Sequence, residues 1–123
     1  MLITNNEPRF NISAYISVPK QLQKNVTEMI GESLTALYGG LSISETVGFW
    51  SSKGNEYIDR YPADELSNHT LQIQLTVLPQ QLNKAISDIE SVLSEVKNTL
   101  GLKARFVHLE VTESKVFHLD LAE

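Results

Sequence analysis

The chain alternates between two hydrophobic periods, and this alternation restricts its fold more than any other feature. Residues 10–18 place an apolar side chain at every second position, which indicates a strand with one buried face. After Pro19 the apolar spacing changes to three and four residues, which predicts an amphipathic helix from Lys20. Gly39-Gly40 ends this helix, because glycine adopts the left-handed C-terminal position without strain. The apolar positions of the helix are Leu22, Val26, Met29, Ile30, Leu34 and Leu37.

The second half of the chain repeats the same alternation. Residues 69–77 read as a strand whose apolar residues point inward, and Pro79 opens a second helix that Gly101 closes. Between the two halves, residues 41–50 predict a strand, 51–55 a turn, 56–61 a returning strand and 62–68 a loop. Gly31 lies inside the first helix, where we expect it to allow close packing on a strand.

The C-terminal segment predicts a hairpin. Residues 107–111 and 117–121 each alternate, and a loop of three or five residues keeps their apolar residues on one face. The three-residue loop, 113–115, would pair Glu110 with His118 and His108 with Asp120. These four side chains indicate either cross-strand charge pairing or a site for a divalent metal, and we favour the charge pairing over a metal.

The predicted order of elements defines the fold class. One strand, a helix, one or two strands, a further strand, a helix and two closing strands predict an α+β, ferredoxin-like antiparallel sheet with both helices on one face. We expect a single domain over residues 1–123 with extra hairpin strands. The sheet face without helices is available for self-association, so we expect a homo-oligomer.

Composition excludes several functions. The net charge is −5 and the 10 Lys and Arg residues are scattered, which argues against a nucleic-acid partner. The absence of cysteine excludes thiolate catalysis and disulfides and fits a reducing cytoplasm. The N-terminal segment lacks the basic and apolar regions of a signal peptide, and no apolar run approaches the length of a membrane span.

The stretch from Leu37 to Asp59 holds most of the glycines and the only tryptophan. Backbone amides at Gly39 and Gly40 have room to approach a ligand, although a helix stop followed by a strand explains these glycines equally well. Trp50 is either a core residue or a platform for a base. The acidic residues after it are either a solvated loop or partners for a ribose hydroxyl or a cationic group.

The same stretch resembles small bacterial and phage domains of unknown function. Their pattern is G-G-x-T/S, then G-x-W, a glycine turn and an acidic residue, and here it reads Gly39-Gly40-Leu41-Ser42, Gly48-Phe49-Trp50, Gly54 and Asp59. Over most of its length the chain also resembles the phage S-adenosylmethionine lyases. Glu7-Pro8 precedes the first strand as in those lyases, and Leu37-Tyr38-Gly39 ends the first helix.

This second resemblance implies a PII-like, ferredoxin-type fold, a trimer with clefts between subunits, and no cofactor. It implies a phage or bacterial protein in the cytoplasm, that of the host if it is phage-encoded. The lyases carry a catalytic tyrosine where this chain has Trp50, and their catalytic glutamate has no ungapped counterpart here. A shifted alignment offers Tyr57, Asp59 and Glu65 as catalytic residues. The candidate ligand-binding residues are Tyr38, Gly39, Gly40, Ser42 and Trp50.

The sequence therefore predicts binding of an adenosine-containing small molecule, S-adenosylmethionine or a nucleotide. Lyase turnover would yield methylthioadenosine and homoserine lactone. Two alternatives remain open: a protein that sequesters a nucleotide signal without catalysis, and an interaction module that acts through its sheet face or edge.

Overall fold

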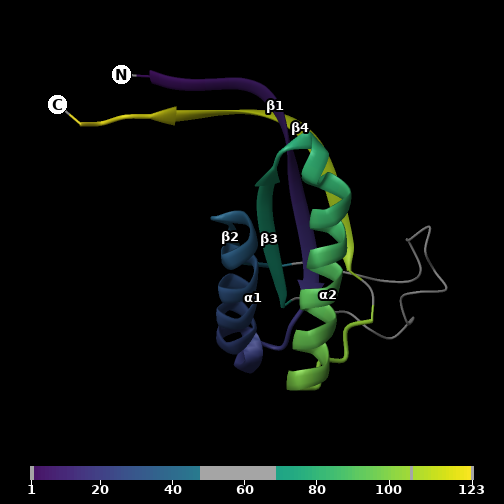
Figure 1. The fold of residues 1–123 in the computed structure, drawn as a ribbon. Helices are drawn as coiled ribbons and strands as arrows, with labels where there is room; N and C mark the ends of the chain where they lie inside the picture. The colour runs from purple at the N-terminus through teal and green to yellow at the C-terminus, as the bar shows by residue number, and fades with distance from the viewer. Residues whose placement is uncertain (1, 48–68, 106, 123) are drawn as a thin grey trace.

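The computed structural model describes residues 2–47, 69–105 and 107–122, with side chains from Pro8 onward. Two helices and a four-stranded sheet make up this part of the chain (Figure 1). The elements are β1 (Leu2–Ser17), α1 (Gln23–Tyr38), β2 (Ser42–Thr46), β3 (Thr70–Val77), α2 (Leu82–Leu100) and β4 (His108–Leu119). Short 3-10 turns at Lys20–Leu22 and Pro79–Gln81 lead into the two helices.

The sheet has the order β2-β3-β1-β4, and every pairing between neighbouring strands is antiparallel. Both helices lie on the same face of this sheet (Figure 1). A β-α-β-β-α-β chain order with this strand order is the ferredoxin-like plait. The α+β, ferredoxin-like fold predicted from the alternating periods is therefore confirmed.

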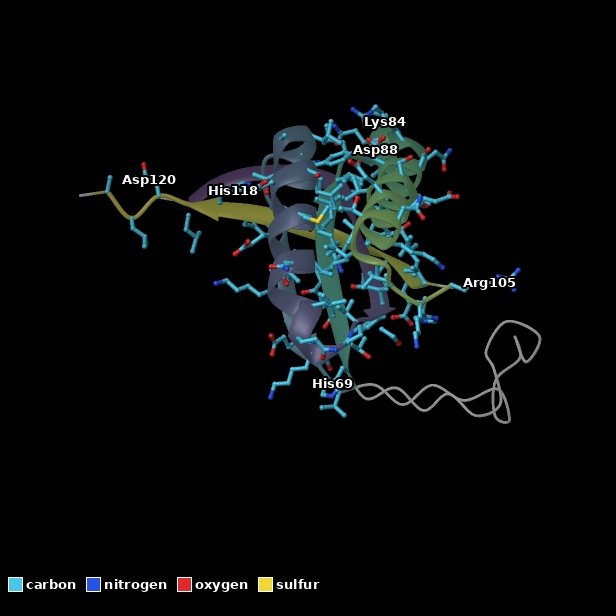
Figure 2. The ribbon with its side chains drawn as sticks, turned by 90° about the horizontal axis from the view of Figure 1, so that it is seen from below. His69, Lys84, Asp88, Arg105, His118 and Asp120 are labelled. Atoms are coloured by element: carbon cyan, nitrogen blue, oxygen red, sulfur yellow. The ribbon has the colours of Figure 1, made fainter. Side chains whose placement is uncertain are left out.

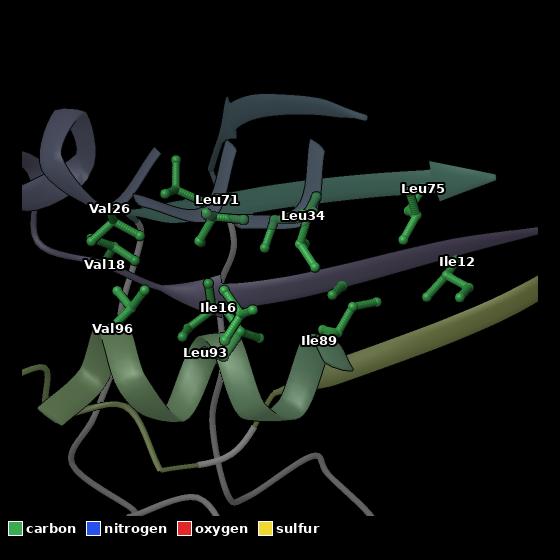
Figure 3. Packing of buried hydrophobic residues seen from close by; sticks show 14 of the residues in the cluster. Ile12, Ile16, Val18, Val26, Leu34, Leu71, Leu75, Ile89, Leu93 and Val96 are labelled. Carbon is green, nitrogen blue, oxygen red and sulfur yellow. The ribbon is translucent and has the colours of Figure 1, made fainter. Parts of the chain in front are cut away.

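The hydrophobic core lies between the sheet and the two helices (Figure 3). Strands β1 and β3 contribute alternate residues, as the period of two predicts, and the helices contribute one stripe each. The side chains that are at most 3% exposed include Ile12, Ala14, Ile16, Leu71, Ile73, Leu75 and Val77 from the strands, and Val26, Ile30, Leu34, Ala85, Ile89 and Val96 from the helices.

Glycine ends both helices in the predicted way. Gly39 follows α1 with φ of 81°, and Gly101 follows α2 with φ of 68°, so both adopt the left-handed conformation. Gly31, by contrast, does not serve close packing. A Cβ added at Gly31 would meet no heavy atom within 4 Å outside the helix backbone.

The predicted C-terminal hairpin is wrong. Residues 108–119 form one continuous strand, β4, which pairs with β1 along its whole length. Glu110 and His108 consequently pair with Ser13 and Tyr15, and not with His118 and Asp120. Because residues 111 and 117 differ by an even number, a straight strand keeps them on one face just as well as the three-residue loop would.

Strand β1 begins eight positions earlier than the alternation predicts, and this produces an extension of the sheet. The pairing with β3 ends at Phe10 and Val77, whereas the pairing with β4 continues to Leu2 and Leu119, with a register shift between Asn5 and Pro8. Residues 2–9 and 114–119 thus form a two-stranded ribbon, and we call this ribbon, together with residues 120–121 that follow it, the arm. The arm runs away from the helices and carries both chain ends (Figure 1).

The expectations for residues 48–68 lie outside the described residues. They are the bulge at Gly48, the turn at 51–55, the strand at 56–61 and the loop at 62–68. The strand predicted at 41–50 is present as β2, Ser42–Thr46.

Gly31 lies inside α1, whereas Gly101 has a positive φ at the end of α2, so the two glycines allow a matched test of the helix geometry. We expect Gly31→Ala to raise the free energy of unfolding by about 1 kcal/mol, because it adds helix propensity and meets no neighbour. We expect Gly101→Ala to lower it by about 1 kcal/mol, because a Cβ is strained at positive φ. Urea unfolding of the two variants measures both changes. Equal changes in the free energy of unfolding would contradict the different backbone conformations assigned to Gly31 and Gly101.

Candidate ligand groove beside helix α2

A groove of about 330 Å³ lies between α2 and the segment that leads into β4. Its volume lies at the lower end of the range for small-molecule sites. Apolar side chains form most of its wall: Ile16, Ile86, Ile89, Leu93, Val107 and Leu109. Glu90, Ser94, Lys97 and Arg105 add polar groups at the same groove.

The helix supplies its side of the groove through ordinary helical spacing. Positions 86, 89, 90, 93, 94 and 97 lie on one flank of α2, because residues three and four apart share a face. This flank faces away from Tyr38 of α1, which contacts Asp88 of α2. The groove and the contact between the helices therefore lie on different sides of α2.

The chain after α2 is fixed against the end of the helix. The backbone N–H of Leu102 donates a hydrogen bond to the carbonyl oxygen of Lys97 at 3.0 Å, and the Leu102 side chain is buried. The Lys97 Nζ donates to the carbonyl oxygen of Ala104 at 2.7 Å. These contacts hold Ala104 and Arg105 beside the last turns of α2 and so define the second wall of the groove.

The arrangement suits a ligand that has a flat apolar part and an anionic part. Aliphatic side chains such as Ile86 and Leu93 offer a surface for a ring, while Arg105 and Lys97 offer positive charge. The carboxylate of Glu90 accepts hydrogen bonds from hydroxyl or amino groups. Small-molecule sites commonly combine an apolar wall with a few polar groups in this way.

Tyr38, one of the predicted ligand-binding residues, links the two helices. Its Oη donates a hydrogen bond to Asp88 Oδ2 at 2.6 Å, and Lys84 Nζ approaches the same oxygen at 2.7 Å. Burial of the phenol, with the hydrogen bond to Asp88 and its negative charge, raises the pKa of Tyr38 to about 12. The hydrogen bond from Lys84, followed by that from Tyr38, lowers the pKa of Asp88.

Three further predicted ligand-binding residues lie at or just after the turn that follows α1: Gly39, Gly40 and Ser42. Gly39 is the C-cap of the helix, and an added Cβ at Gly39 or Gly40 would meet no heavy atom within 4 Å. Ser42 opens β2 and pairs with Gln74 of β3. None of the predicted residues that the structure describes lines the groove. Trp50, Tyr57, Asp59 and Glu65 lie outside the described residues, so their roles stay predictions.

The four residues considered for a metal do not meet. His108 Nε2 lies 3.5 Å from Glu110 Oε1 on the same strand, and the ring of His108 is 5.8 Å from that of Tyr15. His118 and Asp120 lie in the arm, far from the body of the sheet (Figure 2). Within the described ranges, no group of three or more metal-ligating side chains comes together.

Comparisons with known proteins show no family for this chain. No family model matches it, and no curated protein matches it by sequence. Among solved structures, it is similar to CPII of Thiomonas intermedia K12 bound to ADP, AMP and acetate. The identity is 13%, the TM-score is 0.42, and the match covers 94% of this chain and 91% of that one. A similarity this weak supports no conclusion about the ligands of this chain. Within the described residues, neither helix is both long and apolar enough to cross a membrane.

The contact between Tyr38 and Asp88 predicts a specific dependence of stability on alkaline pH. Because the folded-state pKa of Tyr38 is raised to about 12, its contribution is fully present below the unfolded value of 10.0 and is lost as pH rises towards 12. We expect the wild type to be more stable than Tyr38→Phe at neutral pH, with a difference that shrinks between pH 10.0 and about 12. Urea midpoints of both proteins across this range measure the effect. A constant difference would show that the hydroxyl of Tyr38 does not titrate with folding.

Proposed function

We propose that this chain is an oligomeric protein that binds an adenosine-containing small molecule, S-adenosylmethionine or an adenine nucleotide, in the groove beside α2. The observation that carries the proposal is the presence of an apolar wall, two cations and a carboxylate around one groove. Each of these three groups has a counterpart in such a ligand.

The parts of the ligand fit the groove as follows. Adenine is flat and apolar on its faces, so it packs against aliphatic side chains such as Ile86 and Leu93. Ribose hydroxyls are hydrogen-bond donors, for which the carboxylate of Glu90 is a suitable acceptor. Arg105 and Lys97 suit the phosphates of a nucleotide or the carboxylate of a methionine group.

The resemblance to phage S-adenosylmethionine lyases supports turnover of this ligand as part of the proposal. In that reaction a carboxylate oxygen of the substrate attacks its own γ-carbon while the bond from that carbon to sulfur breaks. The electron pair of the broken bond goes to sulfur, so methylthioadenosine leaves and homoserine lactone forms without water. The protein contributes mainly by holding the two reacting atoms close together.

Tyr57, Asp59 and Glu65 remain the proposed catalytic set. A carboxylate from Asp59 or Glu65 would bind the positive sulfonium group and hold it in position, and Tyr57 would take the place of the tyrosine of the lyases. Tyr38, Gly39, Gly40, Ser42 and Trp50 are proposed as a further ligand-contacting region. If the chain has no turnover, the same groove suits a protein that sequesters a nucleotide.

The groove assignment predicts which cation matters for binding. We expect Arg105→Glu to weaken ADP or S-adenosylmethionine binding at least about tenfold, because it replaces a cation at the groove by an anion. Lys103→Glu is the matched control, since it makes the same change of charge two residues away at a side chain that does not line the groove. Calorimetric titration of both variants measures the difference, with thermal unfolding as a check that each is folded. Equal weakening by both substitutions would show that the overall charge of the protein, and not a contact in the groove, determines the affinity.

Lyase turnover has its own test. We expect purified protein incubated with S-adenosylmethionine to release methylthioadenosine, detected by chromatography. We expect Asp59→Asn or Glu65→Gln to abolish turnover if its carboxylate is catalytic, and Glu95→Gln, a control on the exposed side of α2, to leave it unchanged. Unchanged turnover in both Asp59→Asn and Glu65→Gln would remove the two residues from the site. Binding without any product would favour sequestration.

A further inference from the structure

Three of the six large apolar side chains that are exposed among the described residues lie in the arm. Phe117, Leu119 and Leu121 are 49%, 66% and 89% exposed. The first two lie at alternate positions of β4, so they share one side of the ribbon. Exposed apolar groups that gather in this way mark a surface that is covered by a partner.

The arm also lacks the support that a stable ribbon requires. Among the described elements, neither a third strand nor a helix lies beside it beyond Phe10 (Figure 1). A two-stranded ribbon alone is at best marginally stable in water. We therefore expect the arm to pack against another surface.

The groove beside α2 is the apolar surface that matches the arm. Its wall contains Ile86 and Leu93, and it is open on the single chain. In its own chain the arm extends away from Arg105 of the groove, because His118 and Asp120 lie at one end of the molecule and Arg105 at the other (Figure 2). The groove of a second copy is not held in that position.

The charges on the two surfaces also correspond. Along the arm, the cation Lys115 precedes Phe117 and the anion Asp120 follows Leu119. The groove has Glu90 as its anion and Lys97 and Arg105 as its cations, towards the later turns of α2. An arm laid along the groove can therefore place each charge near its opposite in one direction only, which would fix its orientation.

We propose that the arm of one copy lies over the open side of the α2 groove of a second copy, so that Phe117 and Leu119 face its apolar wall and a bound ligand lies between them. Because the arm and the groove are different surfaces, the contact is head-to-tail, and closing it produces a ring of identical copies. The arm then supplies a wall that a single chain lacks. This last step rests on the proposed function, since sites for small molecules bury most of the ligand surface.

Measurement of mass tests the association itself. We expect the wild-type chain to be oligomeric by light scattering, and Phe117→Ser with Leu119→Ser to raise the dissociation constant at least about tenfold. Leu37→Ser is the matched control, because Leu37 is 52% exposed on α1, outside the arm and the groove. A monomeric wild type, or an arm variant with unchanged association, would overturn the proposal.

Crosslinking tests where the arm lies, and the absence of native cysteine makes the result unambiguous. We expect a Phe117→Cys chain mixed with a Ser94→Cys chain to form a disulfide between the two chains under mild oxidation. The pair Leu37→Cys and Ser94→Cys should not. Crosslinking of Phe117→Cys to itself in place of Ser94→Cys would show that arms pack on arms, and would overturn docking in the groove.

Titration with ADP separates this inference from the proposed function. If the wild type associates and crosslinks but binds neither ADP nor S-adenosylmethionine, the proposed function fails and the docking of the arm stands. If the arm variant is monomeric yet binds ADP as tightly as the wild type, the docking stands and the arm is no wall of the ligand site.

Discussion

Strand β1 is the element on which the rest of the structure depends, because it pairs on both sides and also forms the floor of the core. Its Phe10–Ser17 half pairs with β3, and nearly its whole length pairs with β4. Ile12, Ala14 and Ile16 point from it into the core, and Ile16 also lines the groove. A shift of one residue in either pairing would move these side chains to the polar face of the sheet, so the apolar alternation fixes the register.

This dependence explains why most of the fold can be predicted from the sequence and why one end cannot. Where a strand lies over the core, burial requires alternation, and residues 10–18 and 69–77 carry it clearly. Residues 2–9 have no core beneath them and no alternation, so their strand is invisible in the pattern. The wrong prediction of a hairpin at 113–115 has the same cause, because the pattern does not reveal that residues 2–9 form a strand with which β4 can pair. The segment contains no Gly, Pro or Asn to favour a turn, and the long partner in β1 allows β4 to stay straight.

The groove was not predicted because its residues lie far apart in the sequence and each has an ordinary local explanation. Ile16 reads as a core residue of a strand, Ile86 as part of a helical stripe, and Arg105 as a charged residue in a loop. The available signal is the width of the α2 stripe, where Ile86 follows Ala85 and Leu93 follows Val92. Such adjacent pairs mean that the apolar surface extends over more than one flank of the helix. Tyr38 was predicted as a ligand-binding residue, and its hydroxyl contacts Asp88, fifty positions away in the sequence.

The described surfaces of the molecule differ in character. On the sheet face without helices, Gln72 Nε2 donates a hydrogen bond to Tyr15 Oη at 3.1 Å, and His108 lies beside that ring. That region is polar, whereas the wall of the groove and the exposed Phe117, Leu119 and Leu121 of the arm are apolar and lie on different parts of the chain. If the arm of one copy closes the groove of another over a ligand, association and binding share one free energy. Thermodynamic linkage then requires the ligand to strengthen association by the same factor by which association strengthens ligand binding.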